Sequence, residues 1–405
     1  MKILQLCHKI PYPPVDGGCI AINNITQGLL ASGHQVKVVA LSTPKHKVDM
    51  ASLPADYVRN TALETVYVDT TPRFFPALKA LLQNRSYHVS RFETKEMNKK
   101  LASILQKETF DIVQLESVFV APYIPVIRQY SNARIVLRTH NIEHQIWDRI
   151  VQHAKNPFRK LILKTLARKL KIYELSLFGR VDGFMAISDP DYQYFHEQFP
   201  KTRGTVIPFG VDVDRYEPEE DYIPSDKPEL FHIGSMNWLP NVEGVEWFLE
   251  EVWDKILEKF PEVTFIIAGH NFPDTLKQCH APNVTVEEDV PDANEFMLAH
   301  DIMVVPLLSG SGVRVKIIEA MALGKTVITT SVGAEGIDAK DGVQWLIADT
   351  PDEFVTALEK CIKTPDLCKI IGENAREFIQ LHHNSEVITR QIAEFYEALL
   401  PQSVK

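Results

Sequence analysis

Short runs of apolar residues alternate with amphipathic stretches along the first half of the chain. Runs at residues 3–7, 36–41 and 112–115 are rich in Ile, Val and Leu. Between such runs, apolar residues recur every three or four positions, which predicts helices. Strands that alternate with helices predict a parallel sheet with helices on its faces. We therefore expect an α/β fold that is doubly wound, as in Rossmann-like domains.

The same alternation restarts after a proline-rich, acidic segment at residues 208–228. This composition is typical of a domain boundary. We expect a first domain at residues 1–207, a linker at 208–228 and a second α/β domain at 229–384. A last amphipathic helix, at about residues 385–400, is a candidate to pack back on the first domain. A cleft between two such domains is the default place for a ligand.

Residues 301–337 predict a strand, a glycine-rich loop, a helix and a second strand. A glycine loop that enters a helix presents free backbone N–H groups and the positive end of the helix dipole, which together favour an anion such as phosphate. Arg314 and Lys316 lie just inside the predicted helix, where their charge opposes the dipole but is well placed to bind a diphosphate. An ordinary turn with solvated charges is the alternative. The predicted loop residues are Ser309, Gly310, Ser311, Gly312 and Val313.

Length, charge and cysteine content narrow the class of protein. A chain of 405 residues accommodates two or three domains. Its net charge of −10 argues against general nucleic-acid binding. Five scattered cysteines without a Cys-x-x-Cys pair indicate reduced thiols, and no apolar run reaches the length of a membrane span. We expect a cytoplasmic protein that binds no nucleic acid.

Polar residues follow several predicted strands of the first half, where ligands of open α/β sheets gather. They are Glu116, His140, Asn141 and Glu143. His140 and His144 also belong to a His-x-x-Glu-His motif, which resembles the zinc-binding inverzincin motif. His140, however, is expected to end a strand rather than lie within a helix. We favour a substrate-facing role for His140, with a backbone-capping role and a zinc site as alternatives.

Residues 155–171 contain seven basic residues and no acidic one. The predicted helix has an apolar face of Phe158, Leu161, Ile162, Thr165, Leu166 and Leu170. The opposite face consists of Arg159, Lys160, Lys164, Arg168 and Lys171. A basic amphipathic helix either lies on an anionic membrane surface or packs its apolar face on its own domain. The first alternative places the protein peripherally on the inner face of the membrane.

Three segments carry a family resemblance: PPVDGG near the N-terminus, IPFGVD at the linker and PLLSGSGVRVKIIEAMALGKTVITTSVGAEGI in the second half. In combination they resemble the family 4 retaining glycosyltransferases of GT-B fold, over nearly the whole chain. The resemblance implies two Rossmann-like domains that face each other across a cleft. It also implies sugar transfer from a nucleotide-diphosphate sugar, with retention of configuration and without a metal or other cofactor.

The resemblance also implies roles for residues at matching positions. Glu319 matches a glutamate that binds the ribose hydroxyls of the donor. Gly17 and Gly18 match an N-terminal glycine loop that approaches the donor phosphate and sugar. His140 matches a histidine close to the transferred sugar. The acceptor-side candidates are Glu116, Asn141 and Glu143.

This chain departs from the family pattern at two places. The family pairs its motif glutamate with another one eight positions earlier, where this chain has Ser311. An arginine and a lysine usually follow the first strand of the second domain, where this chain has Gly234 and Ser235 and no lysine up to residue 241. We expect both residues to contact the donor, and Arg314 and Lys316 to supply the missing charge. The chain would then belong to a sub-branch with the motif Gly-Ser-Gly-x-Arg-x-Lys-x-x-Glu.

We therefore expect a hexosyl- or related transferase of cell-surface polysaccharide or glycoconjugate assembly. Its acceptor would be a glycan, a lipid-linked molecule or a small molecule. A nucleotide-sugar 2-epimerase of the same architecture is an alternative, which would need cleft carboxylates such as Glu116 and Glu143 as acid and base. A catalytically inactive partner protein that binds nucleotide is another, made possible by Ser311.

Overall fold

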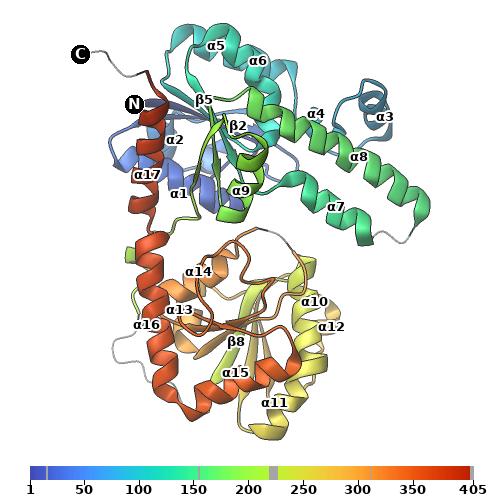
Figure 1. Cartoon of the computed structure of the whole chain (residues 1–405), viewed down its shortest axis with the longest axis vertical. Helices are drawn as coiled ribbons and strands as arrows, with labels where there is room; N and C mark the ends of the chain where they lie inside the picture. The colour runs from blue at the N-terminus through green and yellow to red at the C-terminus, as the bar shows by residue number, and fades with distance from the viewer. Residues whose placement is uncertain (15–16, 154–155, 219–226, 311, 402–405) are drawn as a thin grey trace. The chain divides into compact units, whose positions relative to one another are not determined.

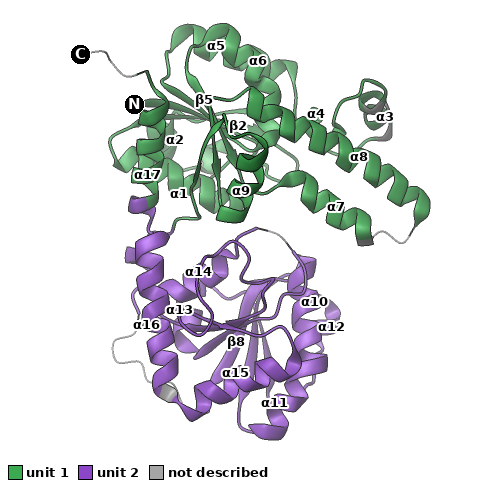
Figure 2. Cartoon of the chain, in the orientation of Figure 1, with its two compact units in different colours: residues 1–210, 388–405 green, residues 211–387 purple. Residues whose placement is uncertain are grey.

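The structure is a computed structural model that describes residues 1–14, 17–153, 156–218, 227–310 and 312–401. The chain divides into two compact units (Figures 1 and 2). Unit 1 comprises residues 1–210 and 388–405, and unit 2 comprises residues 211–387. The chain thus passes from unit 1 to unit 2 and returns to unit 1 at its C-terminal end.

Unit 1 is built on seven parallel strands in the order β3-β2-β1-β4-β5-β6-β7. The strands are β1 (Lys2–Cys7), β2 (Gln35–Ser42), β3 (Glu64–Tyr67), β4 (Ile112–Glu116), β5 (Arg134–Thr139), β6 (Gly183–Ala186) and β7 (Arg203–Val206). Every residue of β4 is buried, as expected of a central parallel strand covered on both faces. The sequence did not predict β7, because Arg-Gly-Thr-Val is too polar to form an apolar run.

Helices cover both faces of this sheet. They are α1 (Gly17–Ala31), α2 (Ala55–Thr61), α3 (Phe74–Leu82), α4 (Tyr87–Ser90), α5 (Lys95–Lys107), α6 (Ile124–Tyr130), α7 (Glu143–His153), α8 (Pro157–Ser176), α9 (Asp189–Gln198) and α17 (Ser385–Leu399), with short 3-10 turns at Met50–Ser52, Val118–Tyr123 and Leu177–Gly179. α17 buries Ile388, Ile392, Tyr396 and Leu399 in the core of unit 1. The Tyr396 hydroxyl also donates a hydrogen bond to the side chain of Gln114 in β4.

Unit 2 is built on six parallel strands in the order β10-β9-β8-β11-β12-β13. The strands are β8 (Glu229–Ser235), β9 (Thr264–His270), β10 (Val284–Glu288), β11 (Ile302–Val305), β12 (Thr326–Thr329) and β13 (Leu346–Ile347). The order repeats the Rossmann order 3-2-1-4-5-6, counted from the first strand of the unit. The expected α/β class, with two doubly wound parallel sheets, is therefore confirmed.

The helices of unit 2 include one long segment in which α10 (Leu239–Trp247) continues through a π-helical turn (Phe248–Trp253) into α11 (Asp254–Lys259). The others are α12 (Asp274–Lys277), α13 (Ala293–Ala299), α14 (Val315–Ala322), α15 (Pro351–Lys363) and α16 (Pro365–His382), with a 3-10 turn at Val213–Arg215. Arg314 is the N-cap residue of α14, so it precedes the helix in which the sequence placed it. Within the described ranges, no helix is long and apolar enough to cross a membrane.

The apolar face predicted for the basic helix at residues 155–171 is only partly buried. In α8, Leu170 is fully buried, whereas Phe158 is 80% exposed. α8 lies against α7 in unit 1 (Figure 1). The residues predicted on one face cover about half of the helix circumference, and α7 covers only part of that arc. Leu161 and Ile162, on the same arc as Phe158, are also exposed.

Candidate functional site

The sheet of each unit has a switch point, where the strand order reverses and ligands of open α/β sheets bind outside the carboxyl ends of the strands. In unit 1 the switch point lies between β1 and β4, and in unit 2 between β8 and β11. Buried or partly buried polar side chains lie at both places. Each candidate site is described within its own unit.

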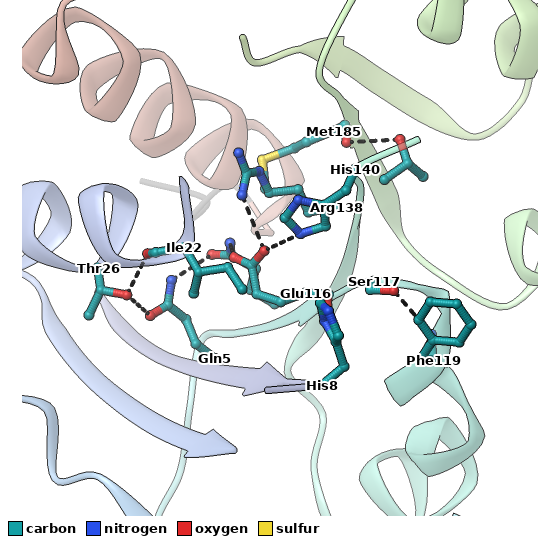
Figure 3. A network of polar contacts seen from close by, with 12 residues as sticks. Gln5, His8, Ile22, Thr26, Glu116, Ser117, Phe119, Arg138, His140 and Met185 are labelled. Atoms are coloured by element: carbon teal, nitrogen blue, oxygen red, sulfur yellow. Dashed lines mark hydrogen bonds and ion pairs between the residues drawn. The ribbon is translucent and has the colours of Figure 1, made fainter. Parts of the chain in front are cut away.

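Glu116, the last residue of β4, is the centre of a buried polar network in unit 1 (Figure 3). One carboxylate oxygen, Oε2, lies 3.3 Å from Arg138 Nη1 and 3.0 Å from His140 Nε2. The other oxygen accepts a hydrogen bond from the Gln114 amide. His8, just after β1, places its Nδ1 2.7 Å from the Glu116 carbonyl oxygen. Glu116 is fully buried, and within the network its carboxylate contacts His140, which is only partly buried.

Electrostatics fix the protonation state of this network. Burial alone would raise the pKa of Glu116, but the charge of Arg138 and the bond from His140 hold it below its ordinary value. Burial, with the charge of Arg138, lowers the pKa of His140. An ionised carboxylate only accepts hydrogen bonds, so Nε2 of the neutral His140 carries the proton. Nδ1 of His140 is then left as an acceptor.

The other candidates of unit 1 lie near this network at the carboxyl edge of the sheet. Asn141 and Glu143 follow β5, and both are partly buried. Burial, together with the charge of Glu174, raises the pKa of Glu143 to about 8, so this carboxyl is largely protonated near neutral pH. Gly17 and Gly18 begin α1, in the connection between β1 and β2. Their backbone N–H groups belong to the first turn of that helix, which has no intrahelical acceptor for them.

The two histidines of the His-x-x-Glu-His motif have different environments. His140 precedes α7 and bonds to Glu116, whereas His144 lies in α7 and is buried. His144 Nδ1 lies 2.6 Å from Glu174 Oε2, and its Nε2 lies 2.9 Å from the Tyr194 hydroxyl. Both ring nitrogens of His144 are therefore occupied by partners within unit 1. A search of the described residues finds no group of three or more potential metal ligands.

Lys316 is the centre of the candidate site in unit 2. Its Nζ lies 3.0 Å from His232 Nε2 and 2.9 Å from Asn241 Oδ1. His232 Nδ1 lies 2.8 Å from the Val304 carbonyl, which can only accept, so Nδ1 carries the ring proton and Nε2 accepts from Lys316. Asn241 in turn donates to the Ser235 carbonyl oxygen over 2.9 Å. The ammonium group is thus held by two neutral acceptors.

No carboxylate in the described part of the chain pairs with Lys316. Burial, followed by the charge of Arg314, pushes the pKa of Lys316 well below its ordinary value. Burial and the charge of Lys316 likewise push the pKa of His232 well below its ordinary value, so His232 stays neutral. A partly buried ammonium group without a described anionic partner favours the binding of an anion.

The glycine loop supports the cationic side chains. The guanidinium of Arg314 lies 5.3 Å from the ring centre of Trp238 and donates to the Gly312 carbonyl over 2.5 Å. A Cβ at Gly310, whose φ is +124°, would lie 2.9 Å from Arg314 Nη2. A Cβ at Gly234 would lie 3.0 Å from Lys316 Nζ. Both positions therefore need glycine for the cations to occupy their places.

The remaining candidates of unit 2 have neighbours of their own. Ser309 donates to Glu243 over 3.1 Å, Ser235 donates to Asn237 over 2.9 Å, and Val313 packs against Gly336. Glu319 accepts a hydrogen bond from the Tyr216 hydroxyl over 3.1 Å. Burial raises the pKa of Glu319 to about 7, although the bond from Tyr216 opposes the rise. Ser311, predicted to bind the donor, lies outside the described residues.

Several residues of the two candidate sites were not predicted from the sequence. They are His8, Arg138 and Glu174 in unit 1, and Tyr216, His232, Trp238 and Asn241 in unit 2. Arg138 and His232 could have been predicted as site residues, because each is a polar residue among the apolar residues of a strand. A charged or polar side chain at a fully buried strand position must have a partner. The other residues lie in loops or helix ends, where polar residues are ordinary.

Comparison with known proteins identifies the family. The Glycosyltransferase Family 4 domain matches residues 15–215, and the domain described as Glycosyl transferases group 1 matches residues 227–364. Together the two matches span most of the chain, one over the sheet of each unit. The chain is a glycosyltransferase of family 4.

Similar proteins agree with this identification. The glycosyltransferase is 23% identical to an uncharacterized 44.6 kDa protein in the cps region of Klebsiella pneumoniae, over 96% of this chain and 98% of the relative. The sucrose-phosphate synthase of Thermosynechococcus elongatus has a similar solved structure, with a TM-score of 0.70 at 16% identity over 98% and 99% of the two chains. Anabaena Alr3699/HepE in complex with UDP gives a TM-score of 0.65 at 16% identity, over 98% and 100%. The fold is therefore GT-B.

Proposed function

We propose that the enzyme transfers a sugar from a nucleotide-diphosphate sugar to a glycan or lipid-linked acceptor, with retention of configuration. The observation that carries this proposal is the Lys316 ammonium group, which two neutral acceptors hold in place. An ammonium nitrogen has three N–H donors, so one remains for a ligand. A diphosphate supplies both the acceptor oxygens and the negative charge that the site lacks.

The surroundings of Lys316 favour a diphosphate over a single carboxylate. Arg314 brings a second positive charge, and the backbone N–H groups at the start of α14 add donors with the favourable end of the helix dipole. These groups would stabilise the diphosphate as it leaves the sugar. A similar fold, that of Anabaena Alr3699/HepE, is solved with UDP. The two cations would then replace the arginine and lysine that the family places after its first strand.

Glu319 is suited to the ribose of the donor. Its carboxyl is partly buried and is held by the Tyr216 hydroxyl. One turn of helix separates it from Lys316, so a nucleotide whose diphosphate meets Lys316 can reach Glu319 with its ribose. Hydroxyl groups of the ribose would donate to the Glu319 oxygen that the Tyr216 hydroxyl does not contact.

In unit 1, His140 is proposed to contact the transferred sugar, with Gly17 and Gly18 near the donor and Asn141 and Glu143 near the acceptor. Glu116 orients the imidazole of His140 and fixes its neutral tautomer. We propose a front-face transfer in which the donor phosphate accepts the acceptor proton, which needs neither a protein base nor a metal. The outcome is a glycosidic bond of the same configuration as in the donor.

A role in cell-surface polysaccharide or glycoconjugate assembly is proposed from one relative, the Klebsiella pneumoniae protein in the cps region. The epimerase alternative is less favoured by the geometry. An epimerase needs carboxyl groups that touch the sugar, and Glu116 is fully buried. Glu143 alone stays available for such chemistry.

Nucleotide binding tests the proposal first. Calorimetric titration with UDP, GDP and ADP, and with their sugar conjugates, should identify a diphosphate ligand that also raises the melting temperature. Lys316→Met should weaken that ligand about a hundredfold, because a charge-assisted phosphate contact is lost. Lys340→Met, which removes an exposed lysine of the same unit, is the matched control and should change nothing. Equal binding by both variants would remove Lys316 from the donor site.

Product analysis then separates the candidate reactions. With a bound nucleotide sugar and a set of glycan and lipid-linked acceptors, NMR of the product should show the anomeric configuration of the donor. Arg314→Ala and Glu319→Ala should abolish transfer. Epimerisation of the nucleotide sugar without any acceptor would overturn the transferase proposal. Tight nucleotide binding with neither reaction, across the acceptor set, would favour an inactive nucleotide-binding protein.

A further inference from the structure

Exposed apolar side chains concentrate on one part of unit 1. Of thirteen large hydrophobic residues that are exposed among those described, seven lie on α3, α7 and α8. They are Phe75, Leu82, Ile150, Phe158, Leu161, Ile162 and Ile172. On α8 the exposed fractions are 80% for Phe158, 66% for Leu161, 57% for Ile162 and 60% for Ile172. Contiguous exposed apolar residues mark an interaction surface.

α8 presents three faces, each with its own character. The first face, with Ala167, Leu170 and Glu174, is buried in unit 1. The second, called the outer face, follows the helical spacing i, i+3, i+4, i+7 and i+14. It consists of Phe158, Leu161, Ile162, Thr165 and Ile172, and it also includes Lys169. The third, called the basic face, lies between the other two and consists of Lys160, Lys164, Arg168 and Lys171, all of them exposed.

The outer face is exposed although α8 is firmly attached. The Glu174 carboxylate accepts the backbone N–H groups of Glu143 and His144 over 2.9 and 3.0 Å, which joins α8 to the start of α7. Lys169 donates to Asn84, just beyond α3, over 2.9 Å. α7 and α8 lie side by side and extend away from the sheet of unit 1 (Figure 1). Apart from the Lys169 contact, the outer face stays available to a partner, because Phe158, Leu161, Ile162 and Ile172 are exposed.

The charge beside the outer face identifies the partner. None of the described carboxylates pairs with the four residues of the basic face. The whole chain carries a net charge of −10, so this basic face is a local exception. An apolar face next to an unpaired basic face is the arrangement of a helix that lies in the interface of an anionic bilayer. There the apolar side chains enter the acyl boundary and the basic ones meet lipid phosphates.

We propose that the outer and basic faces of α8 dock unit 1 on a membrane surface that contains anionic lipid. The inference does not rest on the proposed function, because it uses no residue of either candidate site. Docking would, however, suit an enzyme with a lipid-linked acceptor. Lysine and arginine stems also add apolar contact while their charges stay at the headgroups.

Vesicle binding of the full chain tests the proposal. The protein should sediment with vesicles of phosphatidylcholine and phosphatidylglycerol, and much less with phosphatidylcholine alone. Binding should weaken when NaCl is raised from about 0.05 M to about 0.5 M, because salt screens the headgroup charge. The variant Lys160→Glu, Lys164→Glu, Arg168→Glu should lower the partition coefficient at least a hundredfold, since each basic residue contributes about a factor of five. The variant Phe158→Ser, Leu161→Ser, Ile162→Ser should lower it more than tenfold.

Two control variants separate this surface from general effects. Lys95→Glu, Lys99→Glu, Lys107→Glu reverses three exposed charges on α5, and Ile370→Ser, Leu381→Ser removes exposed apolar residues of unit 2. Both should bind vesicles as the wild type does. Circular dichroism and thermal unfolding show whether each variant is folded, which keeps this result independent of the nucleotide proposal. Equal loss in the α5 variant would overturn the assignment to α8. A wild-type dimer in light scattering that becomes a monomer in the Phe158 variant, without vesicle binding, would reassign the outer face to self-association.

Discussion

The two sheets differ in whether the charged side chain at the carboxyl edge has a counter-charge. At the edge of unit 1, Glu116 lies between Arg138 and His140, and a buried anion meets a buried cation. At the edge of unit 2, Lys316 bonds to the neutral side chains of His232 and Asn241, and no described carboxylate pairs with it. Both regions are polar, buried and located at a switch point, so position alone does not separate them. The difference lies in charge compensation.

Compensation indicates what each region does. A buried ion pair supplies its own counter-charge without a ligand, and the Glu116–Arg138 pair does so although Arg138 Nε has no hydrogen-bond partner among the described residues; such a pair holds its members in place. A buried cation without an anion weakens the fold and is retained where a ligand supplies the missing charge. We therefore interpret the unit 1 network as a support for His140, and the unit 2 cluster as a place where substrate charge binds.

The largest expected effect comes from breaking the compensated network. Glu116→Gln leaves Arg138 buried without a counter-charge, and we expect the free energy of unfolding to fall by about 3 kcal/mol. The matched control is Glu108→Gln, whose carboxylate pairs with Lys2 and Lys37 near the surface and should cost less than about 1 kcal/mol. Urea unfolding measures both. A similar small loss for the two variants would show that the buried network contributes no more than surface pairs.

Lys316→Met should change the free energy of unfolding in the opposite direction. It removes an uncompensated charge, so we expect stability to be unchanged or to rise by about 1 kcal/mol at neutral pH. Lys325→Met is the contrast, because Lys325 donates to the carbonyl oxygens of Leu298 and His300 over 2.9 and 2.8 Å. Leaving those acceptors without a donor should cost about 1–3 kcal/mol. If both lysine variants are destabilised alike, Lys316 is a structural residue rather than a ligand group.

The lowered pKa of Lys316 also predicts how the stability of the wild type depends on pH, and how Lys316→Met should differ from it. The folded state lowers this pKa, so the unfolded state binds more protons between the folded and unfolded pKa values. Stability of the wild type should therefore rise with pH through that window, and the rise should be smaller in Lys316→Met. Nucleoside diphosphate affinity should change the other way, falling as pH rises, because the ligand favours the charged lysine.

The sequence predicted the strands and the glycine loop for clear physical reasons. Parallel strands covered on both faces need apolar runs, and the runs at residues 3–7, 36–41 and 112–115 correspond to β1, β2 and β4. The loop before α14 was visible because glycine and serine are the residues that such turns need. β7 was missed because its short segment has a glycine and an arginine where apolar residues usually lie.

The partners of the site residues could not be predicted in this way. Lys316 meets His232 and Asn241, which lie 84 and 75 residues earlier in the chain. These contacts depend on the order of β8 and β11 in the sheet, which local periodicity does not encode. The faces of α8 show the same limit. The apolar arc of this helix could be predicted from its periodicity, but the part of the arc that packs on unit 1 could not.

Glu143 lies in unit 1 but, unlike Glu116, has no counter-charge among the described residues. Its substitution should give the smallest change in stability. Its carboxyl faces the charge of Glu174 without a described cation as partner, and its pKa is raised to about 8. A raised folded pKa stabilises the protein fully below the ordinary value near 4.5, and this contribution is lost as pH rises through about 8. Glu143→Gln lacks this dependence, so relative to wild type it should gain about 1–2 kcal/mol between pH 6 and pH 9, with solvent screening included.

Melting temperatures of both proteins across that range measure the gain, and Glu96→Gln, an exposed carboxyl on α5, is the control. A parallel pH profile for wild type and Glu143→Gln would mean that a cation outside the described residues neutralises Glu143, and the contrast between the two units would then have no exception.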